Sequence, residues 1–209
     1  MSPLRTTFRF ERNLWKQGYR LIAGVDEVGM GCLAGPVVAA AVILPLEIRI
    51  DFIRDSKTLT ERQRTRLAEQ IRAKAVAWGI GEASPAEIAS LNLHWAAVEA
   101  MRRALSTLQP PPDAVLTDAY RIPDLTGYHE AVIKGDQKVR SIAAASIVAK
   151  AYRDSLMVRL DSAYPGYGFS QHKGYGTVAH QRALDALGPS PIHRLSFAPV
   201  RERLSITTS

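Results

Sequence analysis

Acidic residues stand in this sequence at points where apolar segments end. Asp26 and Glu27 close one such segment, and Asp118 closes another. Asp136 follows a third, within the short motif KGD. Acids at strand ends beside glycine turns are placed to project into a common cleft, where open sheets tend to bind their ligands. These four carboxylates are therefore candidates for a single polar site.

The chemistry of such a site follows from its charge. Carboxylates that share a cleft repel one another and cannot all stay ionised without a compensating cation. Hard oxygen ligands favour Mg²⁺ or Mn²⁺ over zinc, and two such ions activate a water and stabilise a leaving oxygen in phosphodiester cleavage. Cys32, the only cysteine, supports no zinc site. The five histidines lack metal-ligand spacing, and His172, in the later motif HKGY, is expected to make a structural hydrogen bond.

The neighbouring pair Asp26 and Glu27 sets a geometric condition. Successive side chains on a continuing strand point to opposite faces of the sheet. Both acids therefore reach one metal cluster only if the strand ends or bends there, and Gly29 and Gly31 favour a bend. Acids at strand ends are more often solvated turn residues, so the carboxylate pattern by itself leaves that alternative open.

Hydrophobic patterning predicts the elements that carry these residues. Strands are expected at residues 20–26, 35–44, 75–82, 114–118 and 129–134. Thr60 opens a helix through a capping box, and Asn92 caps a second. A long helix follows over residues 142–160, and the chain is helical again after Thr177, broken by two prolines. Strands come first and alternate with helices later, which predicts one α/β domain with a helical C-terminal extension.

Composition sets broader bounds. The chain has 209 residues, enough for one well-packed domain and short for two. Its formal charge of +7 suits a polyanionic partner, although such a charge also serves solubility. A single cysteine fits a reducing compartment, the N-terminus lacks the apolar core of a signal peptide, and the longest apolar run, residues 37–44, is too short to span a bilayer. We expect a cytoplasmic monomer without membrane contact.

A set of ordered motifs goes beyond these patterns. The segment AGVDEVGMGCLAGPVVAAAVIL at 23–44 closely resembles the signature of the ribonuclease HII family. Further blocks fit in the family's order and roughly its spacing: DSKTL (55–59), LN (91–92), VLTDA (115–119), IKGD (133–136), IAAASIVAKAYRD (142–154) and YGFSQHKGYGT (167–177). The resemblance covers about residues 19–200. It implies a ribonuclease H-like mixed β-sheet flanked by helices, as a single catalytic domain over residues 1–209.

The resemblance also implies roles for individual acids. In the family, an Asp-Glu pair, the Asp of the fourth strand and a later Asp bind the metals and carry catalysis. Here these are Asp26, Glu27, Asp118 and Asp136. Asp154 competes with Asp136 for the fourth place, but it lies within the long helix beside Arg153, where a surface ion pair is expected.

Substrate contacts follow from the same resemblance. The family's glycine loop approaches the ribose 2′-hydroxyl with its backbone, and Gly29, Met30 and Gly31 occupy that loop. Tyr175 matches a tyrosine that packs on the sugar at the RNA–DNA junction, the alternative being a half-buried loop aromatic. Lys57, ahead of a capped helix, is a candidate phosphate contact or else a solvated charge. The family's loop normally reads Gly-Arg-Gly, so Met30 puts substrate affinity in question more than reaction type.

The expected activity is that of an endonuclease dependent on Mn²⁺ or Mg²⁺. It would hydrolyse the RNA strand of RNA–DNA hybrids and cut 5′ of ribonucleotides embedded in duplex DNA, leaving 3′-hydroxyl and 5′-phosphate ends, in DNA replication and ribonucleotide excision repair. One alternative is another ribonuclease H-like nuclease, such as a junction resolvase, which would share scattered acids but not the GxG loop with HKGY. The other is a hybrid-binding module that does not cleave, against which the intact set of four acids argues.

Overall fold

The computed structural model describes residues 6–46, 48, 50, 53 and 59–204. The chain divides into two compact units. The sheet unit takes in the described parts of Met1–Val28, Val38–Glu82 and Val98–Ala151. The helical unit takes in those of Gly29–Val37, Ala83–Ala97 and Tyr152–Ser209. No described helix has the length and apolar character needed to cross a membrane.

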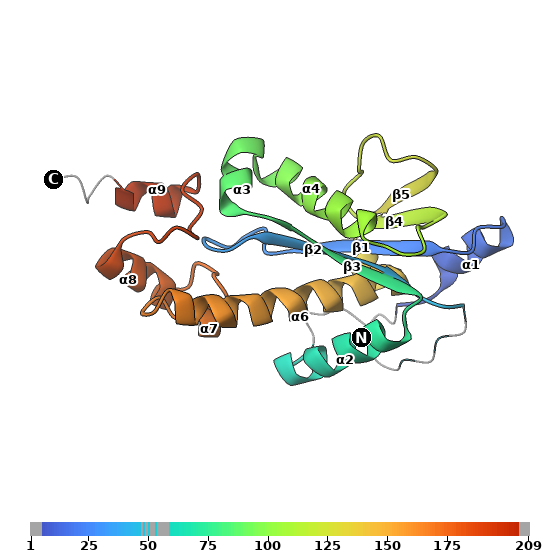
Figure 1. The fold of residues 1–209 in the computed structure, drawn as a ribbon, viewed down its shortest axis with the longest axis horizontal. Coiled ribbons are helices and arrows are strands. Elements are labelled where there is room, and N and C mark those ends of the chain that lie inside the picture. Colours follow the sequence, from blue (N-terminus) through green and yellow to red (C-terminus); the bar gives the residue numbers. More distant parts are fainter. Residues whose placement is uncertain (1–5, 47, 49, 51–52, 54–58, 205–209) are drawn as a thin grey trace. The chain divides into compact units, whose positions relative to one another are not determined.

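A mixed five-stranded sheet forms the centre of the sheet unit (Figure 1). Its strands are β1 (Ile22–Val28), β2 (Val37–Ile43), β3 (Ala77–Ala83), β4 (Ala114–Asp118) and β5 (Tyr128–Val132), in the order β3-β2-β1-β4-β5. β1 pairs antiparallel with β2 and parallel with β4, which pairs parallel with β5. Every residue of β2 is buried, as its unbroken apolar sequence requires. The five predicted strands are confirmed within a few residues at their ends.

Helices cover the two faces of this sheet (Figure 1). On one face lie α2 (Glu61–Lys74) and the first part of α6 (Arg140–Ala163), which share a buried core with β2. On the other lies α4 (Leu93–Ser106), whose backbone approaches Gly79 and Gly81 of β3 so closely that a Cβ on either glycine would overlap it. The predicted caps are present. Thr60 forms a capping box at the start of α2, and the Asn92 side chain accepts from a backbone N–H of α4.

The start of α6 lies directly against β1. A Cβ on Gly24 would stand 2.1 Å from the backbone carbon of Ser141, so only glycine allows the helix to lie this close to the strand. The short helix α1 (Arg9–Lys16), which the hydrophobic pattern does not predict, packs Leu14 into a core with residues of β1, β4 and β5. These packings fix β1 and β4 between helices and so fix the residues at their ends.

The helical unit contains the end of α6 and four shorter helices. These are α3 (Pro85–Leu91), α7 (Phe169–His172), α8 (Val178–Leu187) and α9 (Ala198–Leu204). Its core gathers apolar residues from the loop after β1 and from the C-terminal segments: Leu33, Ala34, Met157, Tyr167, Phe169, Leu184 and Val200. The predicted helical C-terminal extension is confirmed.

Candidate active site

The four candidate acids all belong to the sheet unit. Asp26 and Glu27 lie in β1, Asp118 is the last residue of β4, and Asp136 lies in the one-turn helix α5 (Gly135–Lys138). β1 does not end at the acidic pair, because it continues to Val28 in register with β2. What ends there is its pairing with β4, which stops at Val25 and Thr117. The two parallel strands therefore place their acids just beyond the last shared rung of the sheet.

The turn after β5 ties Asp118 to the segment that carries Asp136. The backbone N–H of Gly135 donates to Asp118 Oδ1 at 2.7 Å. A Cβ on Gly135 would stand 2.6 Å from Ile142 Cδ1, so a side chain at this position would have to displace the end of Ile142. Asp136 follows directly and is buried. The KGD motif thus acts as a connector between two of the acids.

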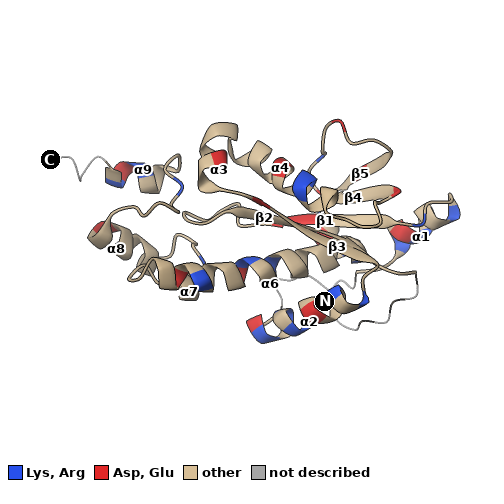
Figure 2. Ribbon diagram, in the orientation of Figure 1, with Lys and Arg blue, Asp and Glu red and all other residues tan. Residues whose placement is uncertain are grey.

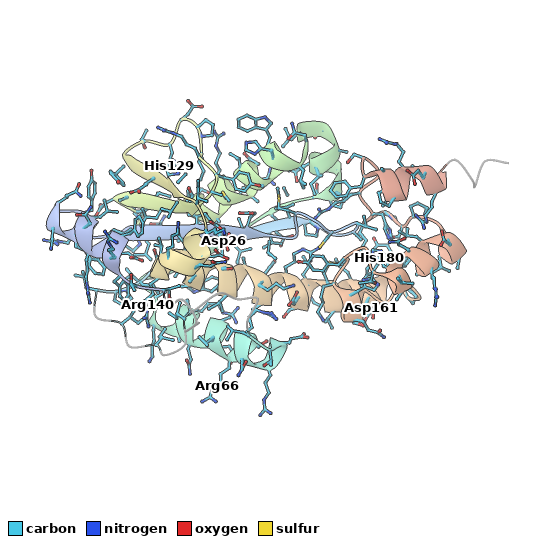
Figure 3. All side chains as sticks on the ribbon, turned by 180° about the vertical axis from the view of Figure 1, so that it is seen from behind. Asp26, Arg66, His129, Arg140, Asp161 and His180 are labelled. Carbon is cyan, nitrogen blue, oxygen red and sulfur yellow. The ribbon has the colours of Figure 1, made fainter. Side chains whose placement is uncertain are left out.

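The charges of three of the candidate acids act on the fourth, Asp26. Asp26, labelled in Figure 3, is only 5% exposed. Burial raises the pKa of Asp26 well above its ordinary value, and the charges of Glu27, Asp118 and Asp136 raise it further, against a hydrogen bond from Ser146. Asp26 and Asp136 are buried and Glu27 and Asp118 are partly buried, and a group of acids placed in this way calls for a compensating cation at neutral pH.

Two residues in this group were not predicted from the sequence. Ser146 of α6 hydrogen-bonds Asp26. Tyr120 lies just past β4, and burial, followed by the charges of Glu27 and Asp118, raises its pKa. Sequence signals existed for both. Ser146 is a polar residue in the otherwise small and apolar run IAAASIVA, and Tyr120 directly follows the block VLTDA.

The donor set fits a hard divalent cation, because all four side chains offer carboxylate oxygens. Within the described residues, however, no three His, Cys, Asp or Glu side chains already stand close enough to ligate one ion together. Asp26 Oδ1 accepts the backbone N–H of Glu27 at 2.9 Å, and Asp118 Oδ1 accepts that of Gly135. Backbone donors thus orient both aspartates.

The predicted substrate loop and Tyr175 lie together in the helical unit. Cys32 forms an antiparallel bridge with Tyr175, and the Leu33 N–H donates to the Gly174 carbonyl at 2.8 Å. Gly29 has φ +95, and a Cβ there would stand 2.4 Å from Arg153 Nε. Tyr175 is 38% exposed, while burial is the main cause of its raised pKa. Lys57 lies outside the described residues.

Two buried arginines donate to carbonyl groups of the substrate loop, of the residues that follow it and of Lys173. Arg153 donates to the carbonyls of Pro36, Lys173 and Ala34 at 3.1, 2.8 and 3.0 Å. Arg194 donates to those of Gly35 and Met30, both at 3.0 Å. Both arginines are 0% exposed. Figure 2 shows Lys and Arg residues in blue on α6 and on the chain before α9.

The prediction that Arg153 and Asp154 form a surface ion pair is wrong. Asp154 is only 5% exposed, and the three guanidinium nitrogens of Arg153 go to backbone carbonyls. An irregular loop has carbonyl groups that no sheet or helix satisfies, and a guanidinium with five N–H donors can satisfy several at once.

Comparison with known proteins decides the family. A family model described as Ribonuclease HII matches residues 23–200. The chain belongs to the ribonuclease HII family. A ribonuclease HII from Anaeromyxobacter sp. (strain Fw109-5) is 52% identical over 97% of this chain and 64% of that protein. Another, from Thiobacillus denitrificans, is 54% identical over 90% of this chain and 92% of that one. The chain thus spans about two thirds of the first relative and nearly all of the second.

Solved structures agree on the fold. The ribonuclease H2 from Pyrococcus horikoshii OT3 has a TM-score of 0.75 at 24% identity, covering 90% of this chain and 99% of that one. A structure of Bst-RNase HIII in complex with Mn²⁺ has a TM-score of 0.64 at 20% identity, covering 90% of this chain and 70% of that one. These structures confirm the predicted ribonuclease H-like mixed sheet. The predicted enzyme class, a ribonuclease H, follows from the family model and the curated relatives.

Proposed function

We propose that this chain is an endonuclease that hydrolyses the RNA strand of RNA–DNA hybrids and cuts 5′ of ribonucleotides embedded in duplex DNA. In this proposal Asp26, Glu27, Asp118 and Asp136 bind the metal ions and are catalytic. The observation that carries it is the placement of Asp26 and Asp118 just past the last paired residues of β1 and β4, together with the charges of Glu27, Asp118 and Asp136 that act on the buried Asp26. Family membership supplies the reaction class, and the acids supply the place where it occurs.

Mg²⁺ or Mn²⁺ would supply an activated water and stabilise the leaving oxygen, so no protein general base is required. The chain's part is to hold the carboxylates in place. Ser146 and the backbone N–H of Glu27 orient Asp26, and the Gly135 N–H orients Asp118. Asp136 is preferred to Asp154 as the fourth acid, because its charge acts on Asp26 whereas that of Asp154 acts on Tyr175.

Substrate contact is proposed for Gly29, Met30, Gly31 and Tyr175. Gly31 is exposed, and a Cβ there would meet nothing within 4 Å, so its backbone is open to close approach by a sugar. Tyr175 offers a partly exposed ring from a segment that is tied to this loop. Lys57 is kept as a phosphate contact on the sequence motif alone.

Finer features of the activity follow the family resemblance. The products would carry 3′-hydroxyl and 5′-phosphate ends, and the protein would act as a cytoplasmic monomer on RNA–DNA hybrids and on duplexes with an embedded ribonucleotide. Residues 1–209 would work as one catalytic domain, which a single cooperative unfolding transition would support.

The experiment is cleavage of an end-labelled DNA duplex that contains one ribonucleotide. We expect a single cut on its 5′ side with Mg²⁺ or Mn²⁺, no cut with a chelator, and no cut of the all-DNA duplex. Binding of the duplex without metal-dependent cleavage would instead identify a non-cleaving module. Cleavage of a four-way DNA junction in preference to the ribonucleotide substrate would identify another nuclease of the same fold.

A further inference from the structure

Three histidines form a cluster in the helical unit, behind the segment that carries Tyr175. His180, labelled in Figure 3, is 0% exposed, and His193 is 1% exposed. The rings of His172 and His180 are stacked, with centroids 4.3 Å apart. His180 Nε2 and His193 Nε2 are 3.0 Å apart. Two imidazole nitrogens at that distance require one to donate and the other to accept.

The direction of each hydrogen bond follows from a backbone amide, which can only donate. The Ser190 N–H donates to His193 Nδ1 at 2.9 Å, so this nitrogen carries no proton. The proton of neutral His193 is then on Nε2 and is donated to His180 Nε2. The proton of His180 is therefore on Nδ1, which donates to the Tyr175 carbonyl at 2.9 Å. This assignment gives a one-way chain from Ser190 to the backbone of Tyr175.

The same reasoning fixes His172 on the other side of Tyr175. The Gly174 N–H donates to His172 Nδ1 at 3.2 Å, so His172 Nε2 carries the proton and donates to the Tyr167 carbonyl at 2.8 Å. The carbonyl of His172 accepts the N–H of Tyr175 at 2.9 Å. The segment between needs this support, because Lys173 has φ 52, an unfavourable value for a residue with a side chain.

We propose that His180 and His193 are positioning residues for Tyr175: as a neutral pair they hold its backbone so that the ring faces the sugar of the substrate. The inference rests on the proposed substrate role of Tyr175. Backbone contacts of the same segment support it. His193 forms an antiparallel bridge with Ala34, two residues past Cys32, which itself bridges Tyr175. The histidine chain therefore links the segment of Tyr175 to the segment of His193. Each of these segments pairs with a residue just after the substrate loop.

The environment keeps the pair neutral. Burial, helped by the neighbouring His180, lowers the pKa of His193 to about 4, and burial lowers the pKa of His180. The titratable and charged groups that face the pair are His172 and Arg203, with the Tyr167 ring 5.0 Å from His193. Arg203 is itself paired with Asp185 at 2.7 Å. Protonating His180 would set its Nε2–H against the Nε2–H of His193 across 3.0 Å. Protonating His193 would set its Nδ1–H against the Ser190 N–H across 2.9 Å.

The test compares two substitutions of His180 that differ in one donor. His180→Asn can keep an N–H near the Tyr175 carbonyl, whereas His180→Leu cannot. We expect His180→Leu to lower kcat/KM on a single embedded ribonucleotide by about tenfold, and His180→Asn to recover most of it. In combination with Tyr175→Ala, His180→Leu should cause no further loss, because both act through one ring. His94→Leu, at an exposed position of the same unit, is the matched control.

The outcomes separate this inference from the proposed function. If Tyr175→Ala loses activity while His180→Leu keeps the kcat/KM of the wild type, the positioning role alone is overturned. An unchanged Tyr175→Ala would overturn the substrate role of Tyr175 and this inference with it. Should His180→Leu fail to fold, ¹⁵N NMR of the wild-type imidazoles decides the matter. We expect the proton on Nδ1 of His180 and on Nε2 of His193, and the opposite tautomer of either would overturn the inference.

Discussion

Arg194→Lys tests how much the hydrogen bonds of Arg194 stabilise the substrate loop. Arg194 is fully buried and reaches the carbonyls of Met30 and Gly35 at 3.0 Å each. Burial lowers its pKa to about 10, against which the nearby Cys32 and Tyr175 act. The guanidinium fork satisfies two acceptors in fixed directions, whereas the ammonium of lysine is a compact and strongly hydrated charge.

The magnitude follows from the bonds that are lost. A hydrogen bond to a charged group contributes about 1.5–3 kcal/mol, and lysine can keep at most one of the two. We therefore expect the free energy of unfolding to fall by about 1.5–3 kcal/mol. At about 2–4 °C per kcal/mol for a chain of this length, the melting temperature falls by about 3–12 °C.

The assay is thermal unfolding together with cleavage kinetics on the embedded-ribonucleotide duplex. Arg182→Lys, at an exposed position of α8, is the control and should change stability by less than about 0.5 kcal/mol. Because the carbonyl of Met30 or that of Gly35 loses its donor, kcat/KM of Arg194→Lys should also fall below that of the control. A melting temperature and kcat/KM equal to those of Arg182→Lys would refute the reasoning that Arg194 holds the loop.

Three further predictions concern the acids, the loop and pH. Asp118→Asn and Asp26→Asn should each abolish cleavage but retain hybrid binding. Each variant should also match or exceed the wild-type melting temperature in metal-free buffer, because it removes one charge from a group of repelling carboxylates. Normal Mg²⁺-dependent activity of either variant would eliminate the metal-site assignment. Met30→Arg should tighten hybrid binding and steepen the slope of log affinity against log salt by about 0.9, if one phosphate is newly neutralised, with the cleavage position unchanged; an unchanged slope would favour a loop that works through its backbone alone. Folding lowers the pKa values of His180 and His193 from 6.5, so their contribution to stability should be complete above pH 6.5 and lost as pH falls toward 4. In equilibrium unfolding, His193→Asn should lose less stability at acid pH than the wild type. An unchanged pH dependence of the free energy of unfolding would contradict this prediction.

The strands and the acids were predictable because their signals are local. β4 has the predicted bounds, since AVLTD is a short apolar run between turn residues, and the Thr60 capping box marks the start of α2. The helix α3 also has such a signal, a capping box of Ser84 and Glu87 with Pro85 between them, yet the segment is short and carries little hydrophobic periodicity.

The support behind the substrate loop was not predictable from the sequence. Arginine is almost never fully buried unless it is paired, so the sequence places Asp154 and Arg153 in a surface ion pair. The partners of Arg153 are the carbonyls of Ala34, Pro36 and Lys173, which lie far from it in the sequence. These carbonyls can accept from Arg153 because the segments that carry them are irregular. The histidine chain was not predictable for the same reason. His180 and His193 come together only in the folded chain, and their spacing in the sequence does not indicate the contact.

The central claim, that four carboxylates of the sheet unit bind the catalytic ions, is tested most directly by a Mn²⁺ binding titration followed by electron paramagnetic resonance. Wild-type protein and Asp118→Asn are compared at equal concentration without substrate, with Asp124→Asn, an exposed acid of the same unit, as the control. The account predicts saturable Mn²⁺ binding by the wild type and the control, and binding weakened at least about tenfold in Asp118→Asn. Equal Mn²⁺ binding by all three proteins would contradict it.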